Sequence, residues 1–280
     1  MRLDQYVALY WPERSRSAWQ RAIELGHVTV NGIIETSTKR LLDEDDEVAV
    51  NVPDAPDFDG QTLPIIYEDE HVTVINKPTG ILSHAKGAQN DEFSVAEFMR
   101  TRQHDGDDTD RPGIVHRLDR GTSGIIICSR DASTKKLLQK QFQDRKAHKA
   151  YLAVVKGVPK DSEARLELPI ARNPKKPATF RVDPAGKSAA TRYQVLSSNG
   201  RFAVVKLWPE TGRTHQLRVH MSYVGTPIVG DVVYGSGEGP INRLCLHAES
   251  IEITIPPSRR QTFEAPAPDD LQQFMDSIRD

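Results

Sequence analysis

The sequence has few cysteines and no long apolar run. Only Cys128 and Cys245 occur among the 280 residues, and both lie in apolar surroundings. Neither a disulfide framework nor a cysteine metal site is therefore expected, and a reducing cytoplasm fits this usage. No stretch approaches the roughly 18 apolar residues of a membrane-spanning helix, and the charged residues Arg2 and Asp4 do not resemble a signal peptide. We expect a cytoplasmic protein without a membrane partner.

Sequence patterns for common cofactors are missing as well. The chain contains no glycine-rich phosphate loop, no dinucleotide-binding fingerprint and no internal repeat. His215 and His220 are five residues apart, which does not place both on one helix face as metal ligands four residues apart would be. The sequence predicts neither a cofactor nor a metal site.

The charges are unevenly distributed although the formal net charge is only −2. Residues 43–60 contain eight acidic residues and no Lys or Arg, whereas residues 111–160 contain twelve Lys or Arg and three acids. Such a basic segment is typical of a surface that binds phosphate groups. A solvated helix face is the alternative interpretation.

The most informative stretch covers residues 111–124 and reads R-P-G-I-V-H-R-L-D-R-G-T-S-G. It holds one carboxylate, Asp119, between basic residues that should keep it ionised. Glycine and serine follow it, and they allow the backbone to turn sharply and to approach another group closely. Because the next residues, 125–128, are apolar, we expect Asp119 on a loop anchored by a buried strand, a common location for catalytic residues. A salt-bridged turn remains the alternative.

Residues 116–124 resemble the signature H-R-L-D-x-x-T-S-G of the RluA-type pseudouridine synthases. Three further stretches agree with that family: K-P-T-G at residues 77–80, K-A-Y at 149–151 and G-R-T-H-Q-L-R-V-H at 212–220. The resemblance implies an α+β fold for residues 64–280, with a mixed, largely antiparallel sheet around a central cleft. It also implies a redox-neutral isomerisation of uridine in RNA that needs no cofactor.

The resemblance further implies roles for single residues. Asp119 would be the catalytic carboxylate, Tyr151 would stack on the extruded base, and Arg213 would form an ion pair with Asp119. Arg117 would fill the gap that the flipped nucleotide leaves in the RNA. The remaining members of the expected RNA-binding set are His116, Arg120 and Leu244, the last as an apolar pocket wall.

Residues 1–52 form a separate expected unit, followed by a Pro- and Asp-rich linker at 53–63. Ser15 and Ser17 are candidate N-caps of a helix that Gly26 ends, and Asn31-Gly32 predicts a tight turn between two strands. The pattern resembles the RNA-binding domain named after ribosomal protein S-four, although Asp45-Asp46 stands where that family has Gly-Asp. A packing domain without a ligand is the alternative. By the resemblance, the side chains facing phosphates are Arg2, Arg14, Arg16 and Arg21.

Two more basic segments are candidates for RNA contact. Asp131 is expected to cap a helix that runs to Arg145 and exposes lysines, among them Lys135 and Lys136. Residues 172–181 fit a basic finger loop, or equally a tolerated insertion.

The sequence therefore predicts a monomeric RNA pseudouridine synthase that acts on large-subunit ribosomal RNA or a pre-ribosomal particle. Three alternatives stay open: a transfer-RNA enzyme of the same family, a non-catalytic RNA-binding assembly factor, and a glycoside-type hydrolase. The hydrolase would need a second carboxylate beside Asp119, for which Asp231 is a spatial candidate.

Overall fold

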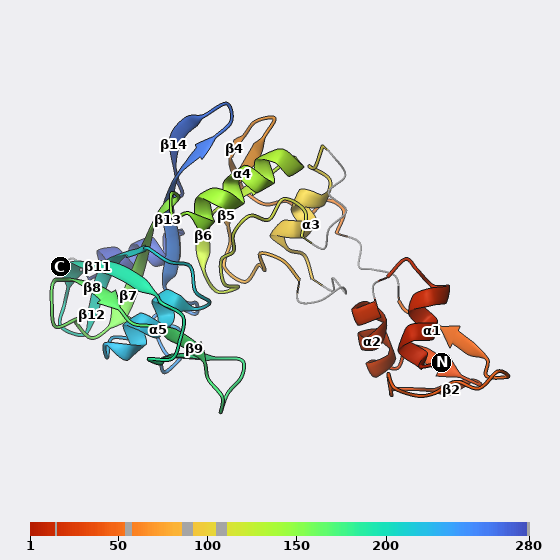
Figure 1. Cartoon of the computed structure of the whole chain (residues 1–280). Helices are drawn as coiled ribbons and strands as arrows, with labels where there is room; N and C mark the ends of the chain where they lie inside the picture. Colours follow the sequence, from red (N-terminus) through yellow and green to blue (C-terminus); the bar gives the residue numbers. More distant parts are fainter. Residues whose placement is uncertain (15, 54–57, 86–91, 105–110, 279–280) are drawn as a thin grey trace. The chain divides into compact units, whose positions relative to one another are not determined.

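The computed structural model describes residues 1–14, 16–53, 58–85, 92–104 and 111–278 (Figure 1). The predicted cap Ser15 and part of the predicted linker, residues 54–57, lie outside these ranges. The chain divides into two compact units, one of residues 1–61 and 84–94 and the other of residues 62–83 and 95–280. Each unit is described separately.

The smaller unit combines two helices with a three-stranded antiparallel sheet in the order β2-β1-β3. Its main apolar core contains Trp19, Ile23 and Val28, each at most 1% exposed. Asn31 and Gly32 both have positive φ, 53° and 75°, which is the backbone of the predicted tight turn. The elements are α1 (Leu3–Tyr10), α2 (Arg16–Glu24), β1 (Val28–Val30), β2 (Ile33–Ile34) and β3 (Val48–Val50).

The larger unit is organised around a nine-stranded sheet in the order β4-β5-β6-β13-β7-β12-β11-β8, with β14 paired to β13. All neighbours are antiparallel except β6 and β13, so the expected mixed, largely antiparallel sheet is confirmed. Its strands are β4 (Ile65–Glu68), β5 (Val72–Lys77), β6 (Ser123–Ser129), β7 (His148–Lys156), β8 (Glu163–Glu167), β11 (Ala190–Ser198), β12 (Phe202–Pro209), β13 (Leu246–Ile255) and β14 (Arg259–Glu264).

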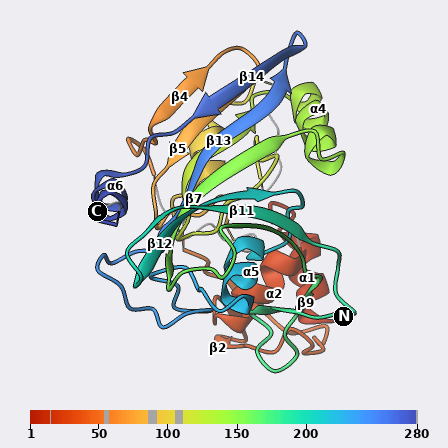
Figure 2. The ribbon, with the colours of Figure 1, turned by 90° about the vertical axis from the view of Figure 1, so that its left-hand side faces the viewer.

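The helices of the larger unit are short. They are α3 (Val95–Arg100), α4 (Ala132–Gln143), α5 (Gln216–Tyr223) and α6 (Asp269–Asp276). Helix α4 packs against β6 and β13 (Figure 2), and the predicted cap is confirmed because Asp131 accepts a hydrogen bond from the Thr134 amide. Among the described helices, none has the length and apolar character needed to span a membrane.

A two-stranded hairpin of β9 (Ile170–Arg172) and β10 (Phe180–Val182) occupies the place of the predicted basic finger loop. Its base shares a small apolar cluster with helix α5. The cluster is separate from the main sheet and contains Ile170, Ala189 and Val219, with Phe180, Val182 and Tyr234 packed against them. The hairpin is thereby attached to the helix that begins within the G-R-T-H-Q-L-R motif.

Strand β6 carries the signature stretch into the sheet. Its residues are all buried, as the apolar run predicted. Gly124 has a φ of 108°, and a Cβ atom there would lie 2.2 Å from the carbonyl oxygen of Ala248 on β13. Glycine is needed at this position because the two backbones approach too closely for any side chain.

Candidate active site

The loop bearing Asp119 is fixed by hydrogen bonds from the preceding segment of the chain. Ser83 Oγ donates to the carbonyl of Leu118 at 2.8 Å and accepts from its amide at 2.9 Å. The Lys77 ammonium, fully buried, donates to the carbonyls of Pro78, Ile81 and Arg120. Residues 77–83, which begin with the K-P-T-G motif, therefore hold the backbone on both sides of Asp119.

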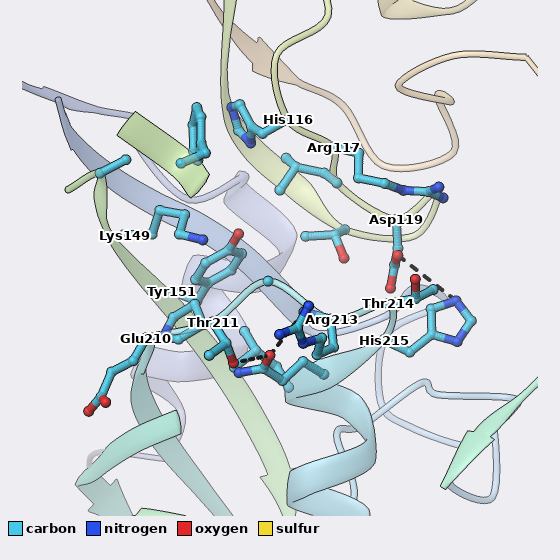
Figure 3. Close-up of a pocket in the computed structure, with 18 of the residues that line it drawn as sticks. His116, Arg117, Asp119, Lys149, Tyr151, Glu210, Thr211, Arg213, Thr214 and His215 are labelled. Atoms are coloured by element: carbon cyan, nitrogen blue, oxygen red, sulfur yellow. Dashed lines mark hydrogen bonds and ion pairs between the residues drawn. The ribbon is translucent and has the colours of Figure 1, made fainter. Parts of the chain in front are cut away.

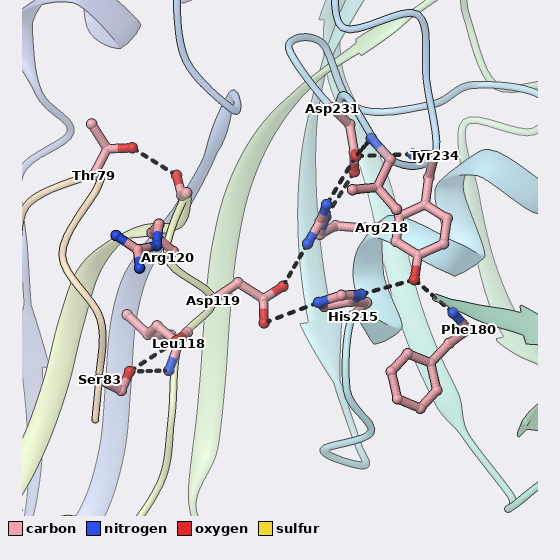
Figure 4. A network of polar contacts seen from close by, with 12 residues as sticks. Thr79, Ser83, Leu118, Asp119, Arg120, Phe180, His215, Arg218, Asp231 and Tyr234 are labelled. Carbon is pink, nitrogen blue, oxygen red and sulfur yellow. Dashed lines mark hydrogen bonds and ion pairs between the residues drawn. The ribbon is translucent and has the colours of Figure 1, made fainter. Parts of the chain in front are cut away.

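Asp119 binds Arg218 with one carboxylate oxygen and faces His215 with the other (Figure 4). Arg218 Nη1 donates to Oδ2 at 3.1 Å, while His215 Nε2 lies 3.9 Å from Oδ1. The Asp119 side chain is 18% exposed. One oxygen is thus held in place, and the other stays outside hydrogen-bond distance of any described side chain.

The expected ion pair between Asp119 and Arg213 is not formed. Arg218, five residues later, takes that place, whereas Arg213 Nε donates to the carbonyl of Ser188 at 3.0 Å. The cause is the start of helix α5. Arg213 precedes the helix in a loop that the Gln216 side chain holds by accepting from the Arg213 amide, while Arg218 lies inside the helix and points to Asp119.

Asp231 orients Arg218 from behind. Both its oxygens accept from the guanidinium, at 2.7 Å from Nε and 2.9 Å from Nη2, and Oδ1 also accepts from the amides of Val233 and Tyr234. Burial raises the pKa of Asp231, but the bonds from Arg218 outweigh it and lower that pKa below its usual value. An ionised, 1% exposed carboxylate of this kind is unsuited to the proton-donor role that a glycoside hydrolase would require.

A cavity of about 580 Å³ opens beside Asp119 (Figure 3). Tyr151 from β7 lines it, and burial together with the charge of Asp119 raises the pKa of its phenol, which keeps it neutral. Lys149 lines the same cavity, and burial lowers its pKa to about 8. Arg213 and Arg117 also line it, so the structure brings the expected Asp119, Tyr151, Arg213 and Arg117 to one cavity.

Other expected site residues have different surroundings. His116 accepts a hydrogen bond from the Ile127 amide and stacks on Phe142, and burial lowers its pKa to about 3. It is thus a neutral support for β6, although it lines the cavity. Leu244 is not among the lining residues; it lies against Gly121, and Leu246 supplies the apolar wall instead.

The two arginines nearest Asp119 in sequence are both exposed. Arg117 forms no ion pair with any described residue, and Arg120 donates to the carbonyl of Gly80 at 3.4 Å. Neither neutralises Asp119 directly. The alternative of a simple salt-bridged turn within the signature therefore does not fit.

In the smaller unit, two of the four expected phosphate-facing arginines are engaged by Asp4. Arg2 and Arg16 donate to that fully buried carboxylate at 3.0 and 2.8 Å. The Arg14 guanidinium lies 5.7 Å from the centre of the Trp19 ring, and Arg21 is exposed on α2.

The sequence reasoning missed Arg218 and His215 as neighbours of Asp119, and it missed Tyr234 as the partner of His215. One signal in the sequence could have identified Arg218 and His215. His215 and Arg218 are three residues apart at the start of a helix, a spacing that puts two side chains on the same face.

Comparison with known proteins identifies the family. The sequence model of the family described as RNA pseudouridylate synthase matches residues 71–223, more than half of the chain. The chain belongs to the RNA pseudouridylate synthase family. The synthase is therefore an isomerase that acts on RNA, and its N-terminal residues 1–48 match the S4 domain.

Curated relatives cover nearly the whole synthase. Ribosomal large subunit pseudouridine synthase D of Borreliella burgdorferi is 35% identical over 276 residues, 91% of this chain and 82% of the relative. The protein of that name from Haemophilus influenzae is 32% identical, over 99% of this chain and 91% of the relative.

Solved structures support the fold. Human RNA pseudouridylate synthase domain containing 4 is 26% identical with a TM-score of 0.61, covering 77% of this chain and 93% of its own. Human RNA pseudouridylate synthase domain containing 1 has the same TM-score at 28% identity, covering 77% of this chain and 87% of its own.

Proposed function

We propose that this synthase converts specific uridines of large-subunit ribosomal RNA to pseudouridine, with Asp119 as the reacting carboxylate. The observation that carries the proposal is the position of Asp119 at the cavity, with one oxygen held by Arg218 and the other beyond hydrogen-bond distance of the described side chains. The second acid lining the cavity, Glu210, is bound in two hydrogen bonds to Arg165. Asp119 is therefore the lining carboxylate that is free to meet a substrate.

The reaction suits one carboxylate in such a position. The bond from N1 of uracil to C1′ of the ribose breaks, the base rotates, and C5 bonds to C1′ while C5 loses a proton and N1 gains one. Asp119 acts either as a nucleophile at C1′ or as a base toward C2′. Arg218 orients the carboxylate in both cases, through its hydrogen bond of 3.1 Å to Oδ2.

The uridine must leave the RNA helix to reach Asp119, and the cavity has the size of a small-ligand site. The Tyr151 ring is positioned to stack on the extruded base, because it lines the cavity and is held in strand β7. Arg117 is exposed next to Asp119 and has no ion-pair partner among the described residues, so its planar cation is available to fill the vacated place in the RNA stack.

RNA binding beyond the cavity is assigned to three basic surfaces: α2 with Arg21, α4 with Lys135 and Lys136, and the β9–β10 hairpin with Lys175 and Lys176. The names of the Borreliella and Haemophilus relatives support ribosomal RNA as the substrate. The S4-type N-terminal residues support a structured RNA. We assign the active form as a monomer acting on the RNA or on a pre-ribosomal particle.

A single-turnover assay with excess enzyme tests the reacting carboxylate. Asp119→Asn keeps the side-chain shape but removes both nucleophile and base, so RNA should bind and no pseudouridine should form. Glu210→Gln is the matched control from the same cavity, and it should keep most of the rate. Substantial product from Asp119→Asn would end the assignment, and release of free uracil by the wild type would indicate a hydrolase.

Mapping of pseudouridine in cells with and without the gene tests the substrate. We expect the loss of one or a few sites in large-subunit ribosomal RNA, restored by the wild type and not by Asp119→Asn. Loss of sites in transfer RNA would favour the alternative substrate. Restoration of growth or ribosome assembly by Asp119→Asn, with no change in modification, would indicate an assembly factor.

A further inference from the structure

The β9–β10 hairpin is connected to Asp119 by a chain of polar contacts (Figure 4). The Phe180 amide on β10 donates to the hydroxyl oxygen of Tyr234 at 2.9 Å. That hydroxyl lies 2.8 Å from His215 Nδ1, and His215 Nε2 faces Asp119 Oδ1 at 3.9 Å. The three contacts join a basic surface hairpin to the unbound oxygen of the carboxylate.

The direction of these hydrogen bonds follows from the groups involved. Tyr234 has one hydroxyl proton, and burial raises the pKa of its phenol, so the proton is retained. Its oxygen already accepts from the Phe180 amide, and among the described residues His215 Nδ1 is the acceptor within hydrogen-bond distance of its proton. Tyr234 therefore donates to Nδ1, which leaves the proton of the neutral ring on Nε2, pointing toward Asp119.

The His215 ring is held by packing as well as by this bond. Its edge meets the Phe180 ring at a centroid distance of 5.6 Å and the Tyr234 ring at 5.5 Å, both nearly perpendicular. Its backbone has a φ of 56°, in the left-handed region that few residues other than glycine adopt. Two aromatic contacts and one hydrogen bond therefore fix the orientation of the ring.

We propose that Tyr234 and His215 form a positioning relay that ties Asp119 Oδ1 to the base of the β9–β10 hairpin. Arg218 fixes Oδ2, and the relay directs an N–H group at the opposite oxygen. When the hairpin is bound to Tyr234 through the Phe180 amide, the Tyr234 hydroxyl donates to His215 Nδ1. Displacement of the hairpin would remove this restraint on the ring orientation and on the position of the ring proton. This inference rests on the proposed role of Asp119. It adds that RNA contact at the hairpin affects the rate of the chemical step.

The test compares rate with affinity, using large-subunit ribosomal RNA from cells that lack the enzyme. Tyr234→Phe removes only the hydroxyl, and His215→Asn removes the ring while tolerating the positive φ. We expect each variant to lower the single-turnover rate roughly tenfold with an RNA Kd within about twofold of wild type. The double variant should be no slower than the slower single, because both changes break one chain. Tyr223→Phe, at an exposed tyrosine on the same helix, is the control and should match wild type.

Two results would overturn the relay. Losses that multiply in the double variant, to about a hundredfold, would mean independent roles, and a weakened Kd with an unchanged rate would mean a binding role only. If Tyr234→Phe does not fold, His215→Asn decides alone, with a wild-type rate against the relay. An active Asp119→Asn enzyme would instead remove the proposed function itself, so the two failures are distinguishable.

Discussion

Asp4 in the smaller unit and Asp119 in the larger unit are both carboxylates held by arginine, yet they differ in what remains free. Asp4 is completely buried, and it accepts from Arg2, Arg16 and Gln20 through both oxygens. Asp119 is 18% exposed, and one of its oxygens accepts nothing from the described side chains within hydrogen-bond distance. The first carboxylate joins α1 to α2, and the second faces a cavity.

This contrast shows that the neighbouring charge does not by itself make an acid a candidate for catalysis. An acid whose lone pairs all accept hydrogen bonds contributes to the stability of the fold. Reaction with a substrate would break those bonds. An acid can contact a substrate when one of its oxygens faces a cavity and a fixed arginine holds the other oxygen. In this site a second acid orients that arginine. Four predictions sharpen or break this comparison.

The largest effect is expected at the partner arginines. Arg218→Lys keeps the charge but cannot bind Asp231 through two nitrogens and Asp119 through a third. We expect the single-turnover rate to fall on the order of a hundredfold, with RNA affinity little changed. Arg16→Lys, the equivalent change beside Asp4, should leave the rate within about twofold. Equal losses in both variants would remove the distinction between the two carboxylates.

Lys77 provides the next test, since its ammonium group binds the backbone of the Asp119 loop at the Arg120 carbonyl. Burial lowers its folded-state pKa to about 7, below the ordinary value of about 10.4 for an unfolded chain. The unfolded state therefore binds more protons between pH 7 and 10, and Lys77 makes stability rise with pH in that window. Lys77→Met should abolish that part of the rise in melting temperature and slow turnover roughly tenfold, through loosening of the loop. Lys39→Met, a change in the smaller unit, is the control, and an unchanged pH profile of stability in Lys77→Met would contradict the assignment.

Much of the fold could be predicted because local patterns and tertiary structure agree. The buried run 125–127, the cap at Asp131 and the tight turn at Asn31-Gly32 all appear as the sequence indicated. Gly124 was expected to allow a close approach, and the backbone of Ala248 is the group it meets. Each of these features depends on neighbours in sequence or on simple burial.

The errors at the site concern contacts between distant segments. Arg213 and Arg218 belong to one motif, and only the position of the first turn of α5 decides which of them reaches Asp119. Leu244 lies two residues before the first residue of β13, and the local path of the chain places it against Gly121 while Leu246 lines the cavity. Such choices are fixed by three-dimensional packing, which residue types alone do not encode.

A smaller effect is expected when Asp4 loses its charge. Burial raises the pKa of Asp4, but hydrogen bonds from Gln20, Arg16 and Arg2 lower it to about 2. Its stabilising contribution is therefore complete above about pH 4 and lost as the pH falls toward 2. Asp4→Asn should cost about 1–2 kcal/mol at neutral pH, a reduced figure because both arginines are partly exposed. Denaturant unfolding at pH 7 and pH 3 measures this, and a larger deficit at the lower pH would contradict the sign.

The smallest effect is expected at Lys136, which is exposed on α4 and belongs to neither carboxylate cluster. If α4 lies along the RNA backbone, Lys136→Ala removes one phosphate contact and leaves the chemical step untouched. The RNA Kd should rise about two- to threefold near physiological salt, and the slope of log affinity against log salt should become shallower by about one unit. Glu163→Ala, which removes an exposed charge from β8, is the control for net-charge effects.

The Lys136 variant should keep the wild-type rate at saturating RNA. A slower rate there, with an unchanged salt slope, would mean that α4 acts on the site through β6 rather than through the RNA.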